Sequence, residues 1–216
     1  MPQFFKSRIP KPELPHLDLH RSDCVRIVEV SVISLGAIAL VGAAVMGIVN
    51  KLTINMHQPK RVEKIAKHLL KYQFPDRSQG QIGLSIGAES FAVVTDRADN
   101  PSLRLFVQAS PVAMEERTSK IVRQYALDAV WRGTWEAVSD ESQSFRYCNE
   151  VVNLEINRGL WSIDENTPAI NAIEYTFDTT VDNYDQTIRI LATGRDAETR
   201  ARTLLNSLQC RQKFKK

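Results

Sequence analysis

Histidine and cysteine, the side chains that most often do nucleophilic, acid–base or metal chemistry, are scarce over most of these 216 residues. All four histidines precede residue 73: His16, His20, His57 and His68. The rest of the chain therefore has no Ser-His-Asp or Cys-His catalytic group and no histidine-bound zinc. Cys148 and Cys210 are too far apart to form a C-x-x-C redox or metal pair. They could form one disulfide in an oxidising compartment, or remain buried free thiols.

Acidic side chains gather in places where they could hold a cation or cleave a substrate. Asp178, Asp182 and Asp185 are expected in one hairpin turn, where their oxygens could bind calcium, but the spacing is not that of an EF-hand loop. Acidic pairs at 140–141 and 164–165 are expected in loops, and paired carboxylates can hydrolyse glycosides. Nothing in the sequence brings these groups together. We therefore expect solvated turns, no metal, no cofactor and no enzymatic activity, with a hydrolase that uses loop carboxylates as an alternative.

The three tryptophans are the largest aromatic side chains available for a core or a binding surface. Trp131 and Trp135 share one face if they lie in a strand, because side chains alternate along a strand. We expect them, with Trp161, to be core aromatics. An exposed aromatic platform for a ligand or partner is the alternative.

Charge is distributed unevenly along the chain, although the net charge is only +3. Lysine and arginine predominate before residue 73, acidic residues predominate after it, and the last six residues are basic again. Nucleic acids are bound mainly through clustered Lys and Arg, so the acidic body of the chain is a poor match for them. We expect no nucleic-acid partner.

A stretch of apolar residues at 30–49 carries no charge. As a helix with a rise of about 1.5 Å per residue it would span roughly 30 Å, the thickness of the hydrocarbon core of a bilayer. We therefore predict a single transmembrane helix that acts as an uncleaved signal anchor, with the lipid bilayer as a partner. Ala39, Ala43 and Gly47 fall on one face of this helix, where small residues permit close helix packing. That face could form a homodimer or contact another membrane protein, or the stripe could be chance.

The orientation of this helix is predicted from conflicting signals. The count of basic residues close to the apolar stretch favours a cytoplasmic C-terminal domain. The two cysteines of the domain favour an oxidising compartment, and long domains cross membranes with little regard for charge. We predict a cytoplasmic N-terminus and a periplasmic or lumenal C-terminal domain, in a bacterial inner membrane or a thylakoid membrane.

The chain divides into five predicted parts. A flexible, proline-containing tail comes first, then the transmembrane helix, a linker, a soluble α+β domain and a basic tail, at residues 1–29, 30–49, 50–58, 59–210 and 211–216 respectively. The domain opens with a helix at 59–72, whose apolar residues recur at helical spacing while lysine and arginine fill the other face. This helix could lie on a lipid surface, but we expect it to be the first helix of the folded domain.

The remaining elements of the domain are expected in runs. Two or three strands follow the first helix, a second helix begins at Ser110-Pro111, four or five strands come next, and a last helix ends near Leu208. Strands that come in runs, without helices between them, favour an antiparallel sheet. We therefore predict an α+β fold in which an antiparallel sheet is covered by about three helices.

This layout resembles the PsbP-like α/β/α domain. The resemblance lies in the leading helix, in Tyr72-Gln-Phe-Pro75 before a run of antiparallel strands, and in a final helix ending Leu204-Leu-Asn-Ser-Leu208. The resemblance covers roughly residues 60–210. The chain is also similar to cyanobacterial membrane-anchored proteins that have one helix before such a domain. The resemblance implies a non-catalytic accessory subunit or assembly factor of a photosynthetic membrane. The metal-binding histidines of that family have no counterpart here, so no functional residue is carried over.

These observations favour a non-enzymatic, membrane-tethered accessory protein or assembly factor that binds a membrane protein complex. Tethering would raise the effective concentration of a weak contact. An extracytoplasmic ligand-binding or sensor domain is the second hypothesis.

Overall fold

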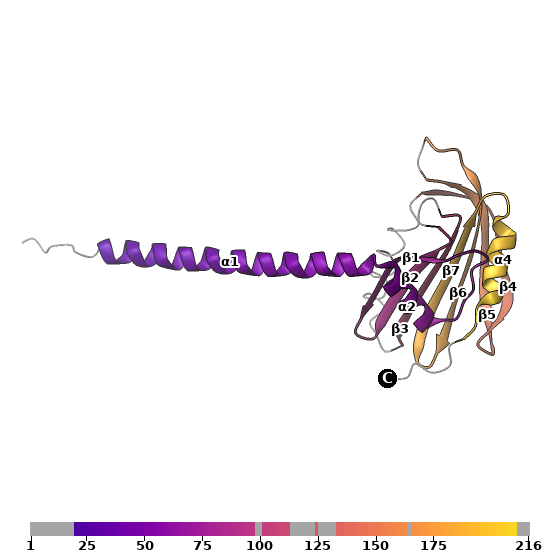
Figure 1. Cartoon of the computed structure of the whole chain (residues 1–216), viewed down its shortest axis with the longest axis horizontal. Coiled ribbons are helices and arrows are strands. Elements are labelled where there is room, and N and C mark those ends of the chain that lie inside the picture. The colour runs from indigo at the N-terminus through magenta and orange to yellow at the C-terminus, as the bar shows by residue number, and fades with distance from the viewer. Residues whose placement is uncertain (1–19, 98–100, 113–123, 125–132, 164–165, 211–216) are drawn as a thin grey trace, which may run out of the picture. The chain divides into compact units, whose positions relative to one another are not determined.

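The computed structural model describes residues 20–97, 101–112, 124, 133–163 and 166–210. The chain forms two compact units, Met1–Asn50 and Lys51–Lys216 (Figure 1). Helix α1 (His20–Met56) supplies the described part of the first unit and its last turns belong to the second. Every strand and the helices α2 (Pro59–Leu69) and α4 (Ala197–Ser207) belong to the second unit.

The apolar stretch that predicted a membrane anchor lies within α1. In the described part of the chain, no helix combines the length and the apolar character needed to cross a membrane. The predicted single-pass signal anchor is therefore wrong, and so is the placement of the two ends of the chain across an inner or thylakoid membrane.

Seven strands form one sheet, in the spatial order β1-β2-β3-β7-β6-β5-β4, and every neighbouring pair is antiparallel. Their bounds are β1 (Gln79–Ile86), β2 (Glu89–Thr95), β3 (Leu103–Pro111), β4 (Thr134–Tyr147), β5 (Glu150–Ser162), β6 (Ile170–Val181) and β7 (Tyr184–Thr193). The long strands β4 and β5 make the outer hairpin at one edge, and β1 forms the other edge (Figure 1).

The expected fold class, an α+β fold of the PsbP-like α/β/α sandwich type with about three covering helices, is wrong, because the structure is mostly sheet. Among the described residues, α2 and α4 pack along one face of the sheet, and α1 contributes Met56 to a small cluster on the other face. Ser110 and Pro111, expected to begin a helix, lie at the end of β3, where Pro111 pairs with Tyr184. The rest of that expected helix falls on 113–132, which is outside the described residues except for Gln124, a helical residue.

Two tight turns connect the longest hairpins. Cys148 and Asn149, between β4 and β5, have φ values of 51° and 66°, and Asp182 and Asn183, between β6 and β7, have the same two values. Positive φ at both central residues defines the two-residue turn that matches the twist of the flanking strands. Asn and Asp tolerate this backbone conformation better than most residues, which fits their place in both turns.

The main core lies between one face of the sheet and the helices α2 and α4. Each helix contributes apolar side chains at helical spacing, among them Val62, Ala66 and Leu69 from α2 and Ala201 and Leu204 from α4. Strands β3 and β7 contribute alternate apolar residues to the same core, including Leu105, Val107, Ile188 and Ile190. The sheet thus fixes both helices on one side of itself, and α2 presents its opposite face outward.

Glycine allows α2 to lie directly on β1. A Cβ atom added at Gly80 would be 2.5 Å from the Pro59 carbonyl oxygen and 2.6 Å from Val62 Cβ, and one added at Gly83 would be 3.2 Å from Val62 Cγ1. Residues three apart normally point to opposite faces of a strand. The irregularity in β1 between Gly80 and Ile82 turns both glycines toward the helix.

We therefore expect Gly80→Ala to lower the free energy of unfolding by about 1–3 kcal/mol, because the contacted oxygen belongs to the backbone and the helix must shift. Urea unfolding followed by circular dichroism measures the change. Gly87→Ala is not a suitable control, because φ there is +60°. Gly83→Ala, with looser contacts, should lose less, and an equal loss in both variants would contradict this packing argument.

Candidate functional site

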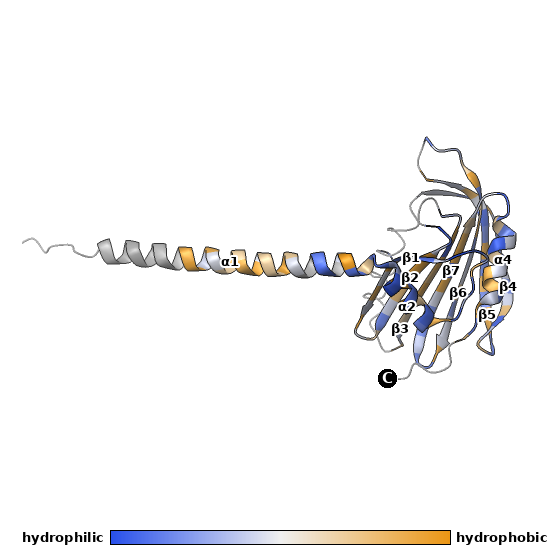
Figure 2. Ribbon diagram, in the orientation of Figure 1, coloured by the Kyte–Doolittle hydropathy of each residue, from blue (hydrophilic) through white to orange (hydrophobic). Residues whose placement is uncertain are grey.

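Helix α2 has one buried face and one basic face. Pro59 occupies its first turn, where the missing N–H removes no hydrogen bond, and the chain turns to extended backbone at Leu70. The side chains on the face away from the sheet are Lys60, Arg61, Lys64, Lys67 and His68, and Figure 2 shows the helix as mainly hydrophilic. Because Val62, Ala66 and Leu69 are buried, the basic face is held in a fixed orientation on the sheet.

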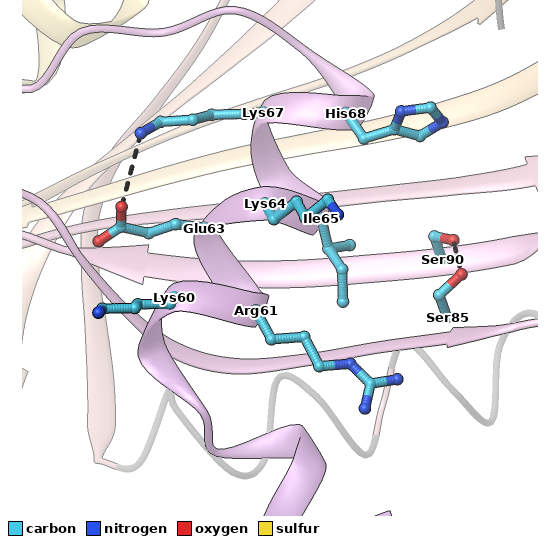
Figure 3. A pocket seen from close by; sticks show the side chains of 9 residues that line it. All are labelled: Lys60, Arg61, Glu63, Lys64, Ile65, Lys67, His68, Ser85 and Ser90. Carbon is cyan, nitrogen blue, oxygen red and sulfur yellow. Dashed lines mark hydrogen bonds and ion pairs between the residues drawn. The ribbon is translucent and has the colours of Figure 1, made fainter. Parts of the chain in front are cut away.

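A pocket of about 660 Å³ lies between this basic face and the β1–β2 hairpin. Besides the basic residues, its lining comprises Glu63, Ile65, Ser85 and Ser90. In Figure 3, Arg61, Ile65 and His68 lie on the side of the helix nearer the two serines, whereas Lys60, Glu63 and Lys67 project from the other side. We call these nine residues the α2 pocket.

Positive charge exceeds negative charge in the α2 pocket. Glu63 is its one carboxylate, and it pairs with Lys67 at 3.5 Å, one helical turn away. Within the described part of the chain, Lys60, Arg61 and Lys64 have no carboxylate within ion-pair distance. The charge of Glu63 also acts on Tyr72: burial first, and Glu63 second, raise the pKa of this phenol well above its ordinary value.

The two serines add hydrogen-bonding groups to the charged ones. Ser90 Oγ donates a hydrogen bond to Ser85 Oγ at 2.7 Å, so the Ser85 hydroxyl keeps its own proton for another acceptor. A guanidinium and two ammonium groups in a pocket that also holds such a hydroxyl are suited to bind carboxylate or phosphate oxygens. The arrangement can therefore hold an acidic group.

The residues singled out from the sequence lie elsewhere. Cys148 and Cys210 are joined by a disulfide, which links the β4–β5 turn to the segment after α4. Ala39, Ala43 and Gly47 are exposed on α1, and a Cβ atom added at Gly47 would meet no atom within 4 Å. No residue of either set lines the α2 pocket.

The acidic residues weighed for calcium binding or hydrolysis do not converge. Asp178 accepts a hydrogen bond from Thr187 and Asp185 accepts one from Thr180, both within the β6–β7 hairpin. The pair at 140–141 lies inside β4, not in a loop, and Glu141 binds Arg158 at 2.9 Å. The pair at 164–165 lies outside the described residues. Among those that are described, no three acidic, histidine or cysteine side chains are placed to hold a metal ion.

The tryptophans pack against one another where they are described. The rings of Trp135 and Trp161 meet edge to face with centroids 6.3 Å apart, and Trp161 is buried. Trp131 lies outside the described residues.

Sequence reasoning found the basic face of α2 but missed the serines that complete the pocket. Two or three strands were expected after the first helix, but the position of the β1–β2 hairpin beside α2 depends on the close packing at Gly80 and Gly83. Two glycines three residues apart in a strand next to an amphipathic helix were the available signal.

Comparison with known proteins adds no family assignment. No protein-family model matches the chain, and no curated protein matches it. The PsbP-like resemblance therefore remains a prediction.

Proposed function

We propose that this protein is a non-catalytic accessory or assembly-factor protein that binds an acidic segment of a protein partner through the α2 pocket. The observation that carries this proposal is the group of three cations, Lys60, Arg61 and Lys64, that have no acidic partner in the described part of the chain and line the same pocket as the Ser85 hydroxyl. Like charges held one helical turn apart repel, and an acidic partner relieves that repulsion.

The tight packing of α2 on the sheet favours a role of its basic face in partner binding over a role as an ordinary solvent-exposed surface. Val62 and Ala66 are fully buried against the sheet, and Gly80 leaves no space for the helix to move inward. A basic face that is already fixed in place loses little further backbone entropy when a partner docks. The lysine side chains still lose mobility, so we expect a weak contact that a partner strengthens by offering several carboxylates.

An acidic protein segment fits this surface better than a nucleic acid does. The part of the chain that follows α2 is predominantly acidic apart from its last residues. A long polyphosphate backbone would approach that acidic body, whereas a short acidic peptide can stay within the α2 pocket.

Removing two of the cations tests the proposal. The Arg61→Ala/Lys64→Ala variant should bind a fluorescein-labelled hexaglutamate peptide about ten-fold more weakly than the natural protein, because about 1.4 kcal/mol is lost with two partly exposed charge contacts. Fluorescence anisotropy at about 50 mM salt, where screening is weak, measures the dissociation constant.

The matched control removes two exposed arginines that do not line the pocket, as Arg97→Ala/Arg195→Ala. This control should bind the peptide nearly as tightly as the natural protein, and labelled hexaglutamine should not bind at all. Equal weakening in both double variants would show that net charge, and not the α2 pocket, attracts the peptide. Stronger binding of a short DNA duplex than of the peptide would favour a nucleic-acid partner and reject the proposal.

A further inference from the structure

Strand β4 lies at one edge of the sheet, and β5 is its neighbour on the inner side (Figure 1). Its register with β5 has one irregularity, between Ala137 and Ser139, and is regular from Ser139 to Tyr147. Apart from the half-buried Phe145 and the buried Tyr147, the side chains of this regular stretch are exposed. We call residues 139–147 the β4 edge.

Every second residue of the β4 edge points its backbone N–H and C=O away from β5. Tyr147 and Glu150 flank a two-residue turn, so they form a pair that exchanges hydrogen bonds across the hairpin. Such pairs alternate with non-hydrogen-bonded pairs along an antiparallel ladder. The residues whose backbone groups point outward are therefore Asp140, Ser142, Ser144 and Arg146. In the described part of the chain, no strand or loop pairs with these outward groups.

The other edge of the sheet is less open to pairing. Strand β1 is shorter, its register is interrupted after Gly80, and α2 packs against it. The carbonyl oxygen of Gln81 accepts a hydrogen bond from His57 Nδ1 at 3.2 Å. Short length, irregularity and a covering helix protect a strand edge from pairing with another chain. Within the described residues no helix packs along the β4 edge, and the β4 edge contains neither proline nor lysine.

Two charges of opposite sign lie near the two ends of the β4 edge. Asp140 and Arg146 are exposed and have no ion-pair partner in the described part of the chain. An even number of residues separates their positions, so both side chains lie on the same face of the sheet. The third charge, Glu141, already binds Arg158 at 2.9 Å. A strand that matches the β4 edge must therefore offer a cation opposite Asp140 and an anion opposite Arg146.

The β4 edge of a second copy meets this requirement in one register. When two antiparallel copies are centred on Gln143, Asp140 of each copy lies opposite Arg146 of the other. Ser142 then lies opposite Ser144, so the outward-pointing residues of the two strands face one another, as a hydrogen-bonded ladder requires. A centre two residues closer to the N-terminus would put two glutamates opposite each other, and a shift of one residue in either direction would leave Asp140 and Arg146 unpaired.

We propose that the β4 edge pairs with the β4 edge of a second copy, so that the two sheets join into one in a symmetric dimer. The two-fold axis passes Gln143, and an Asp140–Arg146 pair on each side of it fixes the register. The charges that would deter an arbitrary strand from this edge are the ones that match in a second copy. None of these residues lines the α2 pocket, so the dimer does not depend on the proposed peptide contact.

Sedimentation equilibrium of the full chain tests the dimer. Exposed apolar residues of α1, such as Leu40 and Met46, could associate by themselves, so a mild non-ionic detergent is present throughout. A single pair of short strands makes a small interface, so the natural protein should pass from monomer to dimer between about 1 μM and about 1 mM. A chain that stays monomeric at about 1 mM would overturn the proposal.

Charge reversal shows whether the β4 edge makes the contact. Asp140→Arg and Arg146→Asp each place like charges opposite each other in the dimer, so each variant alone should dimerise at least about ten-fold more weakly. An equimolar mixture of the two variants should dimerise about as well as the natural protein, because every arginine then faces an aspartate. A dimer that survives in both single variants, or a mixture that stays monomeric, would contradict the proposed pairing and overturn it.

A cross-link gives a measurement that does not depend on charge. With the unbridged cysteine replaced as Cys24→Ser, Gln143→Cys places one new thiol of each copy at the two-fold axis. The Cα atoms of such a non-hydrogen-bonded pair are about 4.5 Å apart, which a disulfide can span. Mild oxidation should therefore give a covalent dimer on a non-reducing gel. Ser139→Cys should give none, because its two copies would lie about 27 Å apart. Equal cross-linking at both positions, or none at either, would reject the dimer.

Discussion

Replacing Asp96 with Asn is expected to lower the free energy of unfolding at pH 7 by about 3 kcal/mol. The Asp96 side chain is 1% exposed and accepts a hydrogen bond from Arg200 Nη2 at 2.7 Å. It also accepts hydrogen bonds from the backbone N–H groups of Ser102 and Leu103 and from the Ser102 hydroxyl. This carboxylate therefore joins the end of β2 to the start of β3 and to α4, and an amide leaves the Arg200 charge without its buried partner.

The effect of Asp96→Asn should depend on pH in a defined direction. Burial alone would raise the pKa of Asp96, but hydrogen bonds from Arg200, Ser102 and Leu103 outweigh burial and leave the pKa below its ordinary value. A carboxylate whose pKa is lowered by folding stabilises the protein above its unfolded pKa of about 3.9 and loses that contribution as pH falls through the folded pKa. The difference between the natural protein and the variant should thus be constant from about pH 5 to 7 and shrink below about pH 4.

Asp76→Asn is the matched control, because Asp76 contacts the same arginine at 3.3 Å but is 65% exposed. Solvent screens this pair, so the loss should stay below about 1 kcal/mol. Urea unfolding at a series of pH values measures both variants. If the two variants lose the same amount, or if the Asp96→Asn difference grows toward low pH, the Asp96–Arg200 contact does not have the role assigned to it.

Hairpin boundaries show where local sequence patterns failed. Residues 145–156 read as one long strand, because apolar residues continue through Cys148. The structure divides them at Cys148 and Asn149, where both residues adopt positive φ. Asn149 was the local signal for a turn at this point. Glycine usually follows Asn in such a turn, but here Glu150 follows, so the signal was weak. The acidic pair at 140–141 reads as a loop for a similar reason: β4 is an edge strand, and edge strands tolerate exposed charges.

The candidate site was predictable only in part. Periodicity located the basic face of α2, since Val62, Ala66 and Leu69 recur at helical spacing and the remaining positions are charged. The partner hairpin depends on contacts between segments, and the irregularity in β1 that brings Gly80 toward the helix follows from packing and not from a local motif. The position of the pocket therefore follows from tertiary structure.

The burial of Arg104 on the face opposite α2 gave no sequence signal. Arg104 alternates with Leu103 and Leu105, a pattern typical of a strand with one face in water. Its burial instead reflects a sheet in which the side chains on both faces of β3 are covered. Alternation of apolar and polar residues identifies the strand correctly but cannot tell a solvated polar face from a buried one.

Removing the Cys148–Cys210 disulfide is expected to lower the free energy of unfolding by about 2–4 kcal/mol. The two cysteines are 62 residues apart, so the bridge closes a long loop and restricts the unfolded chain. The residue before Cys210 pairs with the segment that follows α2: Lys71 N–H donates to the Gln209 carbonyl at 3.0 Å, and Gln209 N–H donates back at 2.9 Å. The bridge thus also holds the last described segment against the start of the domain.

Two comparisons separate the loss of the bridge from the loss of the side chains. The Cys148→Ser/Cys210→Ser variant should unfold at a lower urea concentration than the natural protein, and a reductant should destabilise the natural protein but not this variant. Cys24→Ser, which changes the remaining cysteine, should keep the full response to reductant. Amide hydrogen exchange at Lys71 should quicken in the double variant, because its partner Gln209 is no longer anchored by the adjacent bridge. If both thiols react freely in the folded protein before any reductant is added, the bridge is absent and neither change should appear.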